Sequence, residues 1–320
     1  MNRYSRQEIF IGSTAQEKLR KTSIAIIGCG ALGSVAAELL ARSGVGEIFL
    51  YDRDIVELVN LQRQSCYTQE DINKPKATAL QKHLQRINSD ITIHTSTTHI
   101  NKETIKNVKA DIIIDGTDNI ETRDVIDTYC LEQHIPWIMG SGIRDRGYVM
   151  TIFPGGPRYR DAFPKAAQAE SCEEFGVLAP TTHIIASLQV VEAFKLIFGT
   201  VEEQRETKLH SLSVYEPSIS SFTVKKRRHL EETEDTAPYH IRHCRSKKGI
   251  VVQPSKHLQL NLDALRETYP VLVDTELVLI LEGDIYVYSY GEIIFKQATS
   301  LEEAKKTALD LYKQAGVEFS

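Results

Sequence analysis

Three glycines and one aspartate form the first group of residues whose spacing indicates chemistry. The segment Gly28-x-Gly30-x-x-Gly33 follows a run of β-branched residues and precedes a run of helix-forming residues, so we expect a strand, a tight turn and a helix. Glycines let the backbone approach a phosphate, and the start of a helix offers unpaired N–H groups and a partial positive charge. Asp52 follows the next expected strand, 19 residues after Gly33, where its carboxylate can bind a ribose hydroxyl. The pattern predicts a nucleotide site without identifying the nucleotide.

Further charged and amide side chains follow the same expected strand ends. Asn60 and Arg63 lie three positions apart after Asp52, Lys76 begins a helix, and Asp118 follows an apolar strand. Cations stabilise the charge that develops when a triphosphate is attacked at its α-phosphorus, and a carboxylate can hold Mg²⁺. Each of these charges alone would be an ordinary surface ion pair. Together they favour a nucleoside triphosphate over the dinucleotide of a dehydrogenase.

The composition is that of an ordinary globular protein. The chain has 320 residues, 42% of them hydrophobic and 25% charged, which is enough for one large and one small domain. The net charge of −5 gives no support for nucleic-acid binding over the whole surface. We find no apolar run near the ~20 residues that span a bilayer, no N-terminal signal segment and no disulfide framework among the five cysteines. We therefore expect a cytoplasmic protein without membrane contact.

Alternating strands and helices are expected to position these residues. After a helical segment at 3–20, the expected strands lie at 23–27, 47–51, 91–95, 111–115 and 136–139. Parallel strands in such an arrangement end at one edge of the sheet, where Gly28, Asp52 and Asp118 would meet. The predicted fold class is therefore α/β, with a doubly wound Rossmann-like sheet.

The second half of the chain departs from this alternation. A strand at 148–153 follows a tight connection and is expected to be antiparallel, and two strands near 209–215 and 220–224 close the sheet. Between them lie a long connection at 154–180 and a helix at 181–198.

Charge and hydrophobic patterning divide the chain into three parts. We expect a nucleotide-binding domain at 1–224, a charged linker at 225–242 and a small α+β domain at 243–320. A hairpin is expected to turn at Gly283-Asp284.

The motifs together resemble those of the ThiF/MoeB/HesA family, the bacterial relatives of ubiquitin-activating enzymes. The resemblance covers about residues 3–224. It rests on Arg3-Tyr4-Ser5-Arg6-Gln7, Gly28-x-Gly30-x-x-Gly33, Asp52-x-Asp54-x-Val56-x-x-x-Asn60-Leu61-x-Arg63-Gln64, Lys74-Pro75-Lys76 and Asp115-x-Thr117-Asp118-Asn119.

The resemblance implies an ATP-dependent adenylyltransferase. Its partner would be a ubiquitin-like sulfur-carrier protein of the ThiS or MoaD type with a C-terminal Gly-Gly, used in thiamine or molybdopterin biosynthesis. The terminal carboxylate would attack the α-phosphate of ATP·Mg²⁺ and give an acyl-adenylate and pyrophosphate. This attack needs no general base, because a terminal carboxylate is ionised at neutral pH.

The resemblance also implies residue roles. Arg63 and Lys76 would act on the phosphates, Asp118 would hold Mg²⁺, and Arg6 would reach into the site of a neighbouring subunit, so that the active form is a homodimer. The residues implied in nucleotide binding are Gly28, Gly30, Gly33, Asp52, Asp54, Asn60, Arg63, Gln64 and Lys76.

Cys172 lies where relatives often place a cysteine that bonds to the carrier or to a sulfur donor. A thiolate there could capture the acyl-adenylate, and a tolerated surface cysteine is the other interpretation.

The chain departs from the resemblance at two Cys-x-x-Cys pairs that hold a structural zinc in many relatives. Their positions are Arg158 and Asp161, then Cys244 and Lys247. Because three of the four ligands are absent, we expect no structural zinc. We expect instead that Asp161 pairs with Lys247 or Arg158.

Other functions remain open on the sequence. A relative that activates a carboxylate on modified tRNA has support only from the basic run 225–228, and no nucleic-acid partner is expected otherwise. A nucleotide-binding module without catalysis would fit the missing zinc ligands, but Arg63, Lys76 and Asp118 are intact. A nicotinamide oxidoreductase would bind its pocket without competition from ATP.

Overall fold

The computed structural model divides the chain into two compact units, Met1–Arg228 and His229–Ser320. It describes residues 2–163, 176–199, 206–227, 238–244, 249–255, 258–275, 277–298, 300–317 and 319. Each unit has its own sheet and its own buried core.

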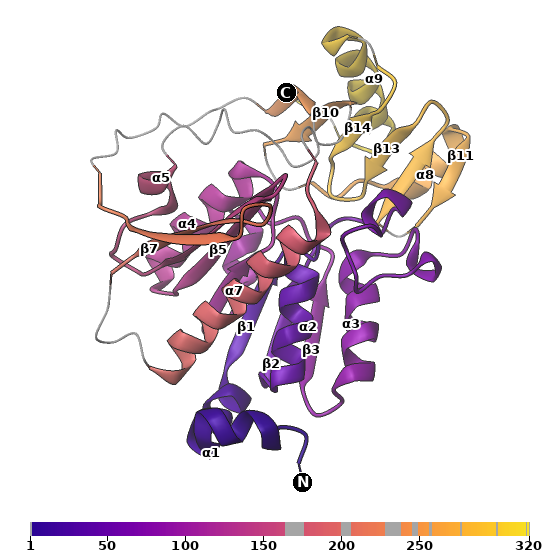
Figure 1. The fold of residues 1–320 in the computed structure, drawn as a ribbon. Helices are drawn as coiled ribbons and strands as arrows, with labels where there is room; N and C mark the ends of the chain where they lie inside the picture. Colours follow the sequence, from indigo (N-terminus) through magenta and orange to yellow (C-terminus); the bar gives the residue numbers. More distant parts are fainter. Residues whose placement is uncertain are drawn as a thin grey trace. The chain divides into compact units, whose positions relative to one another are not determined.

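The first unit is organised around an eight-stranded sheet with the strand order β3-β2-β1-β4-β5-β6-β7-β8 (Figure 1). The first five strands in that order are parallel, and β5 to β8 pair in an antiparallel manner. The predicted fold class is confirmed. The strands are β1 (Ser23–Ile27), β2 (Glu47–Tyr51), β3 (Thr92–Ser96), β4 (Ile112–Asp115), β5 (Trp137–Ile143), β6 (Arg146–Ile152), β7 (Lys208–Ser213) and β8 (Ser218–Thr223).

Helices cover both faces of this sheet because the central strands are apolar on both faces. Along β1, Ile24 and Ile26 face one core and Ala25 and Ile27 face the other. The first core is covered by α2 (Gly33–Ser43), α3 (Lys76–Ile87) and α7 (Ala179–Phe198). The second is covered by α4 (Ile120–Gln133), the 3₁₀ helix η3 (Thr104–Asn107) and α5 (Tyr159–Ala162). The short α5 lies within the 154–180 segment expected to be an irregular connection.

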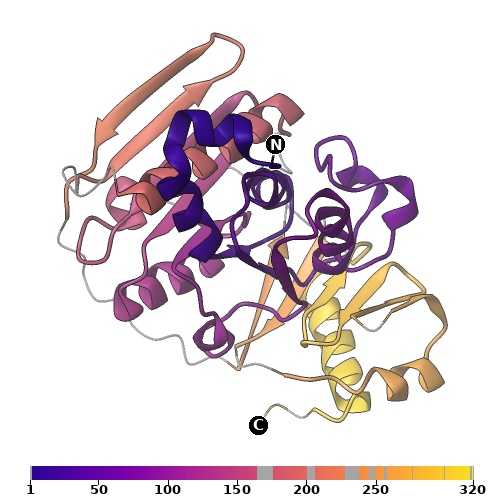
Figure 2. The ribbon, with the colours of Figure 1, turned by 90° about the horizontal axis from the view of Figure 1, so that it is seen from below.

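The N-terminal helix α1 (Ser5–Lys21) kinks at Gly12, whose φ of 81° is non-helical. It lies beside the starting ends of β1 and β2, where the N–H of Gly46 donates to the carbonyl of Leu19 at 3.0 Å (Figure 1). Strand β8 lies at the edge of the sheet opposite β3, and all six of its residues are exposed. The β7–β8 hairpin projects at the upper left of Figure 2.

Helix α7 is long and apolar enough to cross a membrane by length and composition, which the sequence analysis did not anticipate. In the structure it packs on β5, β6 and α2. Ile185, Ala186, Val190 and Ala193 are buried in the core that α2 and α3 share. The helix therefore has the packing of a core helix.

In its described residues, the second unit has a six-stranded antiparallel sheet and two helices. The expected hairpin joins β12 (Val278–Leu281) to β13 (Ile285–Tyr288), with Gly283 and Asp284 at φ values of 86° and 55°. Strand β9 (Tyr239–Cys244) begins inside the 225–242 segment expected to be a linker, because it pairs with β10 (Gly249–Pro254). The remaining elements are α8 (Leu262–Thr268), β11 (Val271–Asp274), β14 (Ile293–Phe295) and α9 (Leu301–Gln314).

The packing of the glycine turn gives a first testable prediction. A Cβ at Gly33 would lie 1.8 Å from the carbonyl oxygen of Gly28, whereas a Cβ at Gly30 would meet only the Gln64 amide, at 3.7 Å. We expect Gly33→Ala to lower the free energy of unfolding by about 3 kcal/mol and Gly30→Ala to change it by less than about 0.5 kcal/mol. Urea denaturation measures both, and equal midpoints for the two variants would contradict the packing described.

Candidate active site

The turn between β1 and α2 is held by backbone atoms in close contact. Gly28 has a φ of 90°, and a Cβ there would lie 2.7 Å from the backbone of Gly116, which follows β4. A Cβ at Gly116 would in turn lie 2.3 Å from the carbonyl oxygen of Gly28. Glycine is therefore required on both sides of this contact. Gly30 is packed less closely, because a Cβ there would meet only Nε2 of Gln64, at an ordinary van der Waals distance of 3.7 Å.

Asp52 connects the end of β2 to the glycine turn. Its Oδ2 accepts a hydrogen bond from the N–H of Cys29 at 2.6 Å, and its Oδ1 accepts one from the N–H of Asp54 at 2.7 Å. Burial raises the pKa of the Asp52 carboxyl, and the Lys76 ammonium opposes that shift. Each carboxylate oxygen can accept a second hydrogen bond. The side chain can thus receive a ribose hydroxyl without releasing the turn.

Lys76 is the buried cation of the site. It begins α3, is only 8% exposed, and its Nζ lies 3.4 Å from Oδ2 of Asp54. Burial lowers the pKa of Lys76, but the carboxylates of Asp54, Asp52 and Asp118 more than offset this, so that the pKa lies above its ordinary value. The ammonium is therefore charged at neutral pH. The structure thus brings together four residues that the sequence analysis singled out. Asp52 and Asp54 follow β2, Lys76 begins α3, and Asp118 lies in the β4–α4 connection.

The segment after β2 supplies amides beside the glycine turn. Asn60, at the end of the 3₁₀ helix η1 (Leu58–Asn60), is buried, and its Oδ1 accepts from the N–H of Glu57 at 3.1 Å. Gln64 is 4% exposed, and its Oε1 has no hydrogen-bond partner within the described part of the chain. A buried side-chain oxygen without a partner can accept a hydrogen bond from a ligand. The oxygen and nitrogen of the Gln64 amide can also exchange places, so the amide can accept or donate.

Arg63 and Asp118 lie at the border with solvent. Arg63 is half-buried, and its Nη1 donates to the carbonyl of Val59 at 3.2 Å, within its own turn. Asp118 is exposed, and its charge raises the pKa of both Lys76 and Arg123. An exposed carboxylate beside buried cations has the oxygen chemistry that Mg²⁺ prefers.

Two residues that position the site were missed by the sequence analysis. The hydroxyl of Tyr67 lies 2.7 Å from the carbonyl oxygen of Cys29 and 3.3 Å from that of Lys76, so it links the glycine turn to α3. On α4, Arg123 donates from Nε to Oδ2 of the buried Asp115, the last residue of β4, at 2.8 Å. Its Nη2 also donates to the carbonyls of Thr117 and Gly140. Arg123 therefore fixes the loop that carries Asp118.

One predicted site residue does not lie at the site of its own chain, and another lies outside the described residues. Arg6 is exposed on α1, and this helix lies at the starting ends of the strands (Figure 1). Gly28 and Asp118 instead follow the final residues of β1 and β4. Arg6 therefore does not contribute to the site of its own chain, and a role in the site of a second subunit stays a prediction. Cys172 lies outside the described residues.

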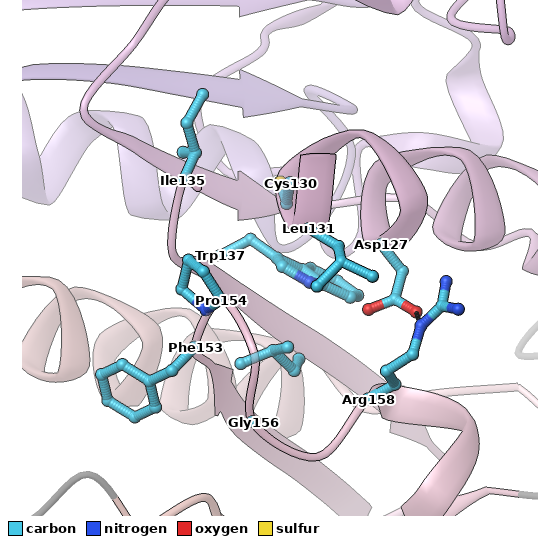
Figure 3. Close-up of a pocket in the computed structure, with 10 residues that line it drawn as sticks. Asp127, Cys130, Leu131, Ile135, Trp137, Phe153, Pro154, Gly156 and Arg158 are labelled. Carbon is cyan, nitrogen blue, oxygen red and sulfur yellow. Dashed lines mark hydrogen bonds and ion pairs between the residues drawn. The ribbon is translucent and has the colours of Figure 1, made fainter. Parts of the chain in front are cut away.

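Arg158 and Asp161 stand at the positions of the relatives' first zinc pair. Arg158 forms an ion pair, and Asp161 accepts hydrogen bonds from backbone N–H groups. The Arg158 guanidinium pairs with Asp127 of α4 at 2.5 Å, beside Trp137, as Figure 3 shows. Asp161 is 2% exposed and accepts from the backbone N–H groups of Arg158 at 2.7 Å and Arg227 at 2.6 Å. The expected ion pair between Asp161 and the Arg158 guanidinium is therefore wrong, because α4 offers that guanidinium a buried carboxylate. Lys247, the alternative partner, lies outside the described residues.

Comparisons with known proteins place this geometry in a family. The ThiF family model matches residues 4–233. The chain is 36% identical to the sulfur carrier protein ThiS adenylyltransferase of Bacillus subtilis (strain 168), over 71% of this chain and 69% of that protein. It is 34% identical to a probable molybdopterin-synthase adenylyltransferase of Porphyra purpurea, over 96% of this chain and 76% of that protein. A crystal structure of E. coli MccB with ATP is 25% identical, with a TM-score of 0.62, and covers 71% of this chain and 72% of that chain.

The buried ion pair between Asp115 of β4 and Arg123 of α4 can be tested by measuring the free energy of unfolding. Arg123→Gln leaves the Asp115 carboxylate, which is fully buried, without its cation, so we expect the free energy of unfolding to fall by about 3 kcal/mol. The double variant Asp115→Asn/Arg123→Gln should lose less than the sum of the single variants. Arg86→Gln, at an exposed position of α3, is the control and should change stability by less than about 0.5 kcal/mol. Additive losses in the double variant would show that the pair is not coupled.

Proposed function

Because this chain belongs to the ThiF family, we propose that it is an ATP-dependent adenylyltransferase that acts on a ubiquitin-like sulfur-carrier protein. In the proposed reaction the carrier's C-terminal glycine carboxylate attacks the α-phosphorus of ATP, forms an acyl-adenylate and displaces pyrophosphate. The observation that carries the proposal is the charged Lys76, buried beside the glycine turn between Asp54, Asp52 and Asp118. The names of the B. subtilis and P. purpurea relatives and the ATP in the MccB crystal structure support it.

Each part of the site has a task in this reaction. The backbone at Gly30 and the start of α2 receive phosphate oxygens, and Asp52 receives the ribose. Oε1 of Gln64, which lacks a hydrogen-bond partner in the described part of the chain, binds beside them. Lys76 and Arg63 stabilise the charge that develops at the α-phosphorus and on the leaving pyrophosphate. Since the attacking carboxylate is already ionised, the protein contributes positioning and electrostatics, and no proton has to be removed.

A divalent cation fits the exposed end of the same cluster. Asp118 supplies a carboxylate oxygen there, on a loop that Arg123 fixes. We propose that Asp118 holds Mg²⁺ together with the phosphates. The ion would neutralise phosphate charge and assist the departure of pyrophosphate.

We also propose that the active form is a homodimer in which Arg6 of one subunit completes the site of the other. Arg6 is exposed and lies away from the site of its own chain. On the same helix the side chains of Ile9 and Phe10 are 78% and 92% exposed, which is unusual for apolar residues of a folded chain. A second subunit that covers this helix would bury those side chains and place Arg6 next to a triphosphate.

Carrier-dependent ATP–pyrophosphate exchange tests the activity. We expect exchange with a ThiS-type or MoaD-type carrier and none with the same carrier lacking its Gly-Gly. Lys76→Ala should lower the exchange rate by about 100-fold, because a buried cation at the developing charge is lost. Asp118→Asn should raise the Mg²⁺ concentration needed for half-maximal exchange. Lys82→Ala, at an exposed position of α3, is the matched control and should leave exchange unchanged. Exchange that is independent of every carrier, or equal in Lys76→Ala and wild type, would contradict the proposal.

Mixing two inactive variants tests the role of Arg6. Arg6→Ala should form dimers and lack exchange activity, as should Lys76→Ala. In a mixed dimer the Arg6→Ala subunit keeps an intact pocket and receives Arg6 from its partner. Random reassociation should therefore restore about a quarter of the wild-type rate. No restoration would remove Arg6 as a residue that acts across subunits, and an unchanged rate in Arg6→Ala alone would remove it from the site.

A further inference from the structure

Three side chains with metal-binding atoms meet beside the nucleotide-binding residues. They are Glu38 on α2, Cys66 in the segment after η1 and His83 on α3. Oε2 of Glu38 lies 3.0 Å from Nε2 of His83 and 3.3 Å from Sγ of Cys66, and the three ligand atoms all lie within 4.8 Å of one another. We propose that this cluster binds one divalent transition-metal ion and that Zn²⁺ fits it best. Thiolate, imidazole and carboxylate are the ligands that Zn²⁺ takes in proteins.

The spacing of the three atoms suits a tetrahedral ion. Ligands at ordinary Zn–S, Zn–N and Zn–O bond lengths lie about 3.3–3.8 Å apart. The two separations from Glu38 are close to that range, and the ligand atoms of Cys66 and His83 lie within 4.8 Å of each other, so side-chain movements would complete the geometry. The side chains of His83 and Glu38 are 34% and 25% exposed, whereas Cys66 is 3% exposed. The ion would therefore be held from the buried side by sulfur, with its fourth position open to water.

Neighbouring groups already orient the ligands. Nε and Nη2 of Arg42 each lie 2.7 Å from Oε1 of Glu38, which leaves Oε2 directed at Cys66 and His83. Such outer contacts fix ligand orientation in known metal sites. Burial and the Glu38 charge raise the pKa of the Cys66 thiol to about 12, so the metal-free protein keeps the proton on sulfur. When the metal binds, a sulfur–metal bond replaces the S–H bond and the proton passes to solvent.

The cluster joins the three segments that carry the nucleotide-binding residues. Helix α2 follows the glycine turn, Cys66 lies two positions after Gln64, and α3 begins at Lys76. A bound ion would hold these segments together. None of the three residues stands at a position of the relatives' zinc pairs, and the inference does not depend on the proposed adenylyltransferase activity.

Cobalt binding to the full-length chain is the test, because Co²⁺ has visible absorption and occupies zinc sites. We expect chelator-treated protein, in buffer containing Mg²⁺, to bind one equivalent of Co²⁺ with a sulfur-to-cobalt charge-transfer band. One equivalent of Zn²⁺ should abolish the band. Cys66→Ser should lack it, and His83→Gln, at a partly exposed position, should weaken Co²⁺ binding about tenfold or more. Zn²⁺ should also raise the thermal midpoint of the wild type and not that of His83→Gln.

Two control variants separate this site from other residues of the same types. Cys130→Ser removes a buried thiol elsewhere. His94→Gln removes a histidine that pairs with Glu47, and among the described residues this pair belongs to no cluster with a cysteine. Both should bind Co²⁺ like the wild type. No thiolate band in the wild type, a band that survives in Cys66→Ser, or undiminished binding by His83→Gln would each overturn the proposal.

Discussion

The site depends on keeping one ammonium group charged where water barely reaches it. Removing a charged amine from water costs several kcal/mol, which nearby carboxylates must offset. Lys76 is 8% exposed, and Asp54, Asp52 and Asp118 supply the opposing charge from the end of β2 and from the loop after β4. These groups meet only if α3 begins at the edge of the sheet where β2 and β4 end. The parallel order of the central strands meets this condition and leaves a cation positioned before any ligand arrives.

A second constraint is the distance between the turn after β1 and the loop after β4. Gly28 and Gly116 touch through their backbones, so neither position has room for a side chain. If these segments were held farther apart, Asp118 would move away from Lys76 and its charge would be screened by water. Arg123 fixes the loop after β4 by donating hydrogen bonds to Asp115 and to the carbonyl of Thr117. The electrostatics of the site thus rest on the packing of two turns.

Local sequence patterns were sufficient for the sheet and for the residues at its strand ends. The central residues of runs such as 23–27 and 112–115 are apolar on both faces, and a glycine, Gly28 or Gly116, follows each run. The positioning residues were not predictable in this way. Tyr67 acts on Cys29, 38 positions away, and Arg123 acts on Gly140, 17 positions away. Nothing in the neighbouring sequence marks such a partner, because the contact exists only after the strands have paired.

The same argument explains why an expected contact at Arg158 was wrong. Proximity in the chain suggested Asp161, but a short helix directs that carboxylate to backbone N–H groups, and α4 presents the equally buried Asp127 to the guanidinium. A side chain takes the partner that satisfies it best in three dimensions. The segment between β2 and α3 also depends on such contacts. It contains two single-turn 3₁₀ helices and backbone hydrogen bonds between Val56 and 73–74, and the side-chain contacts of Tyr67 and Cys66 attach it to its neighbours. A ligand that added one further contact there would act directly on the residues that we propose to bind the phosphates.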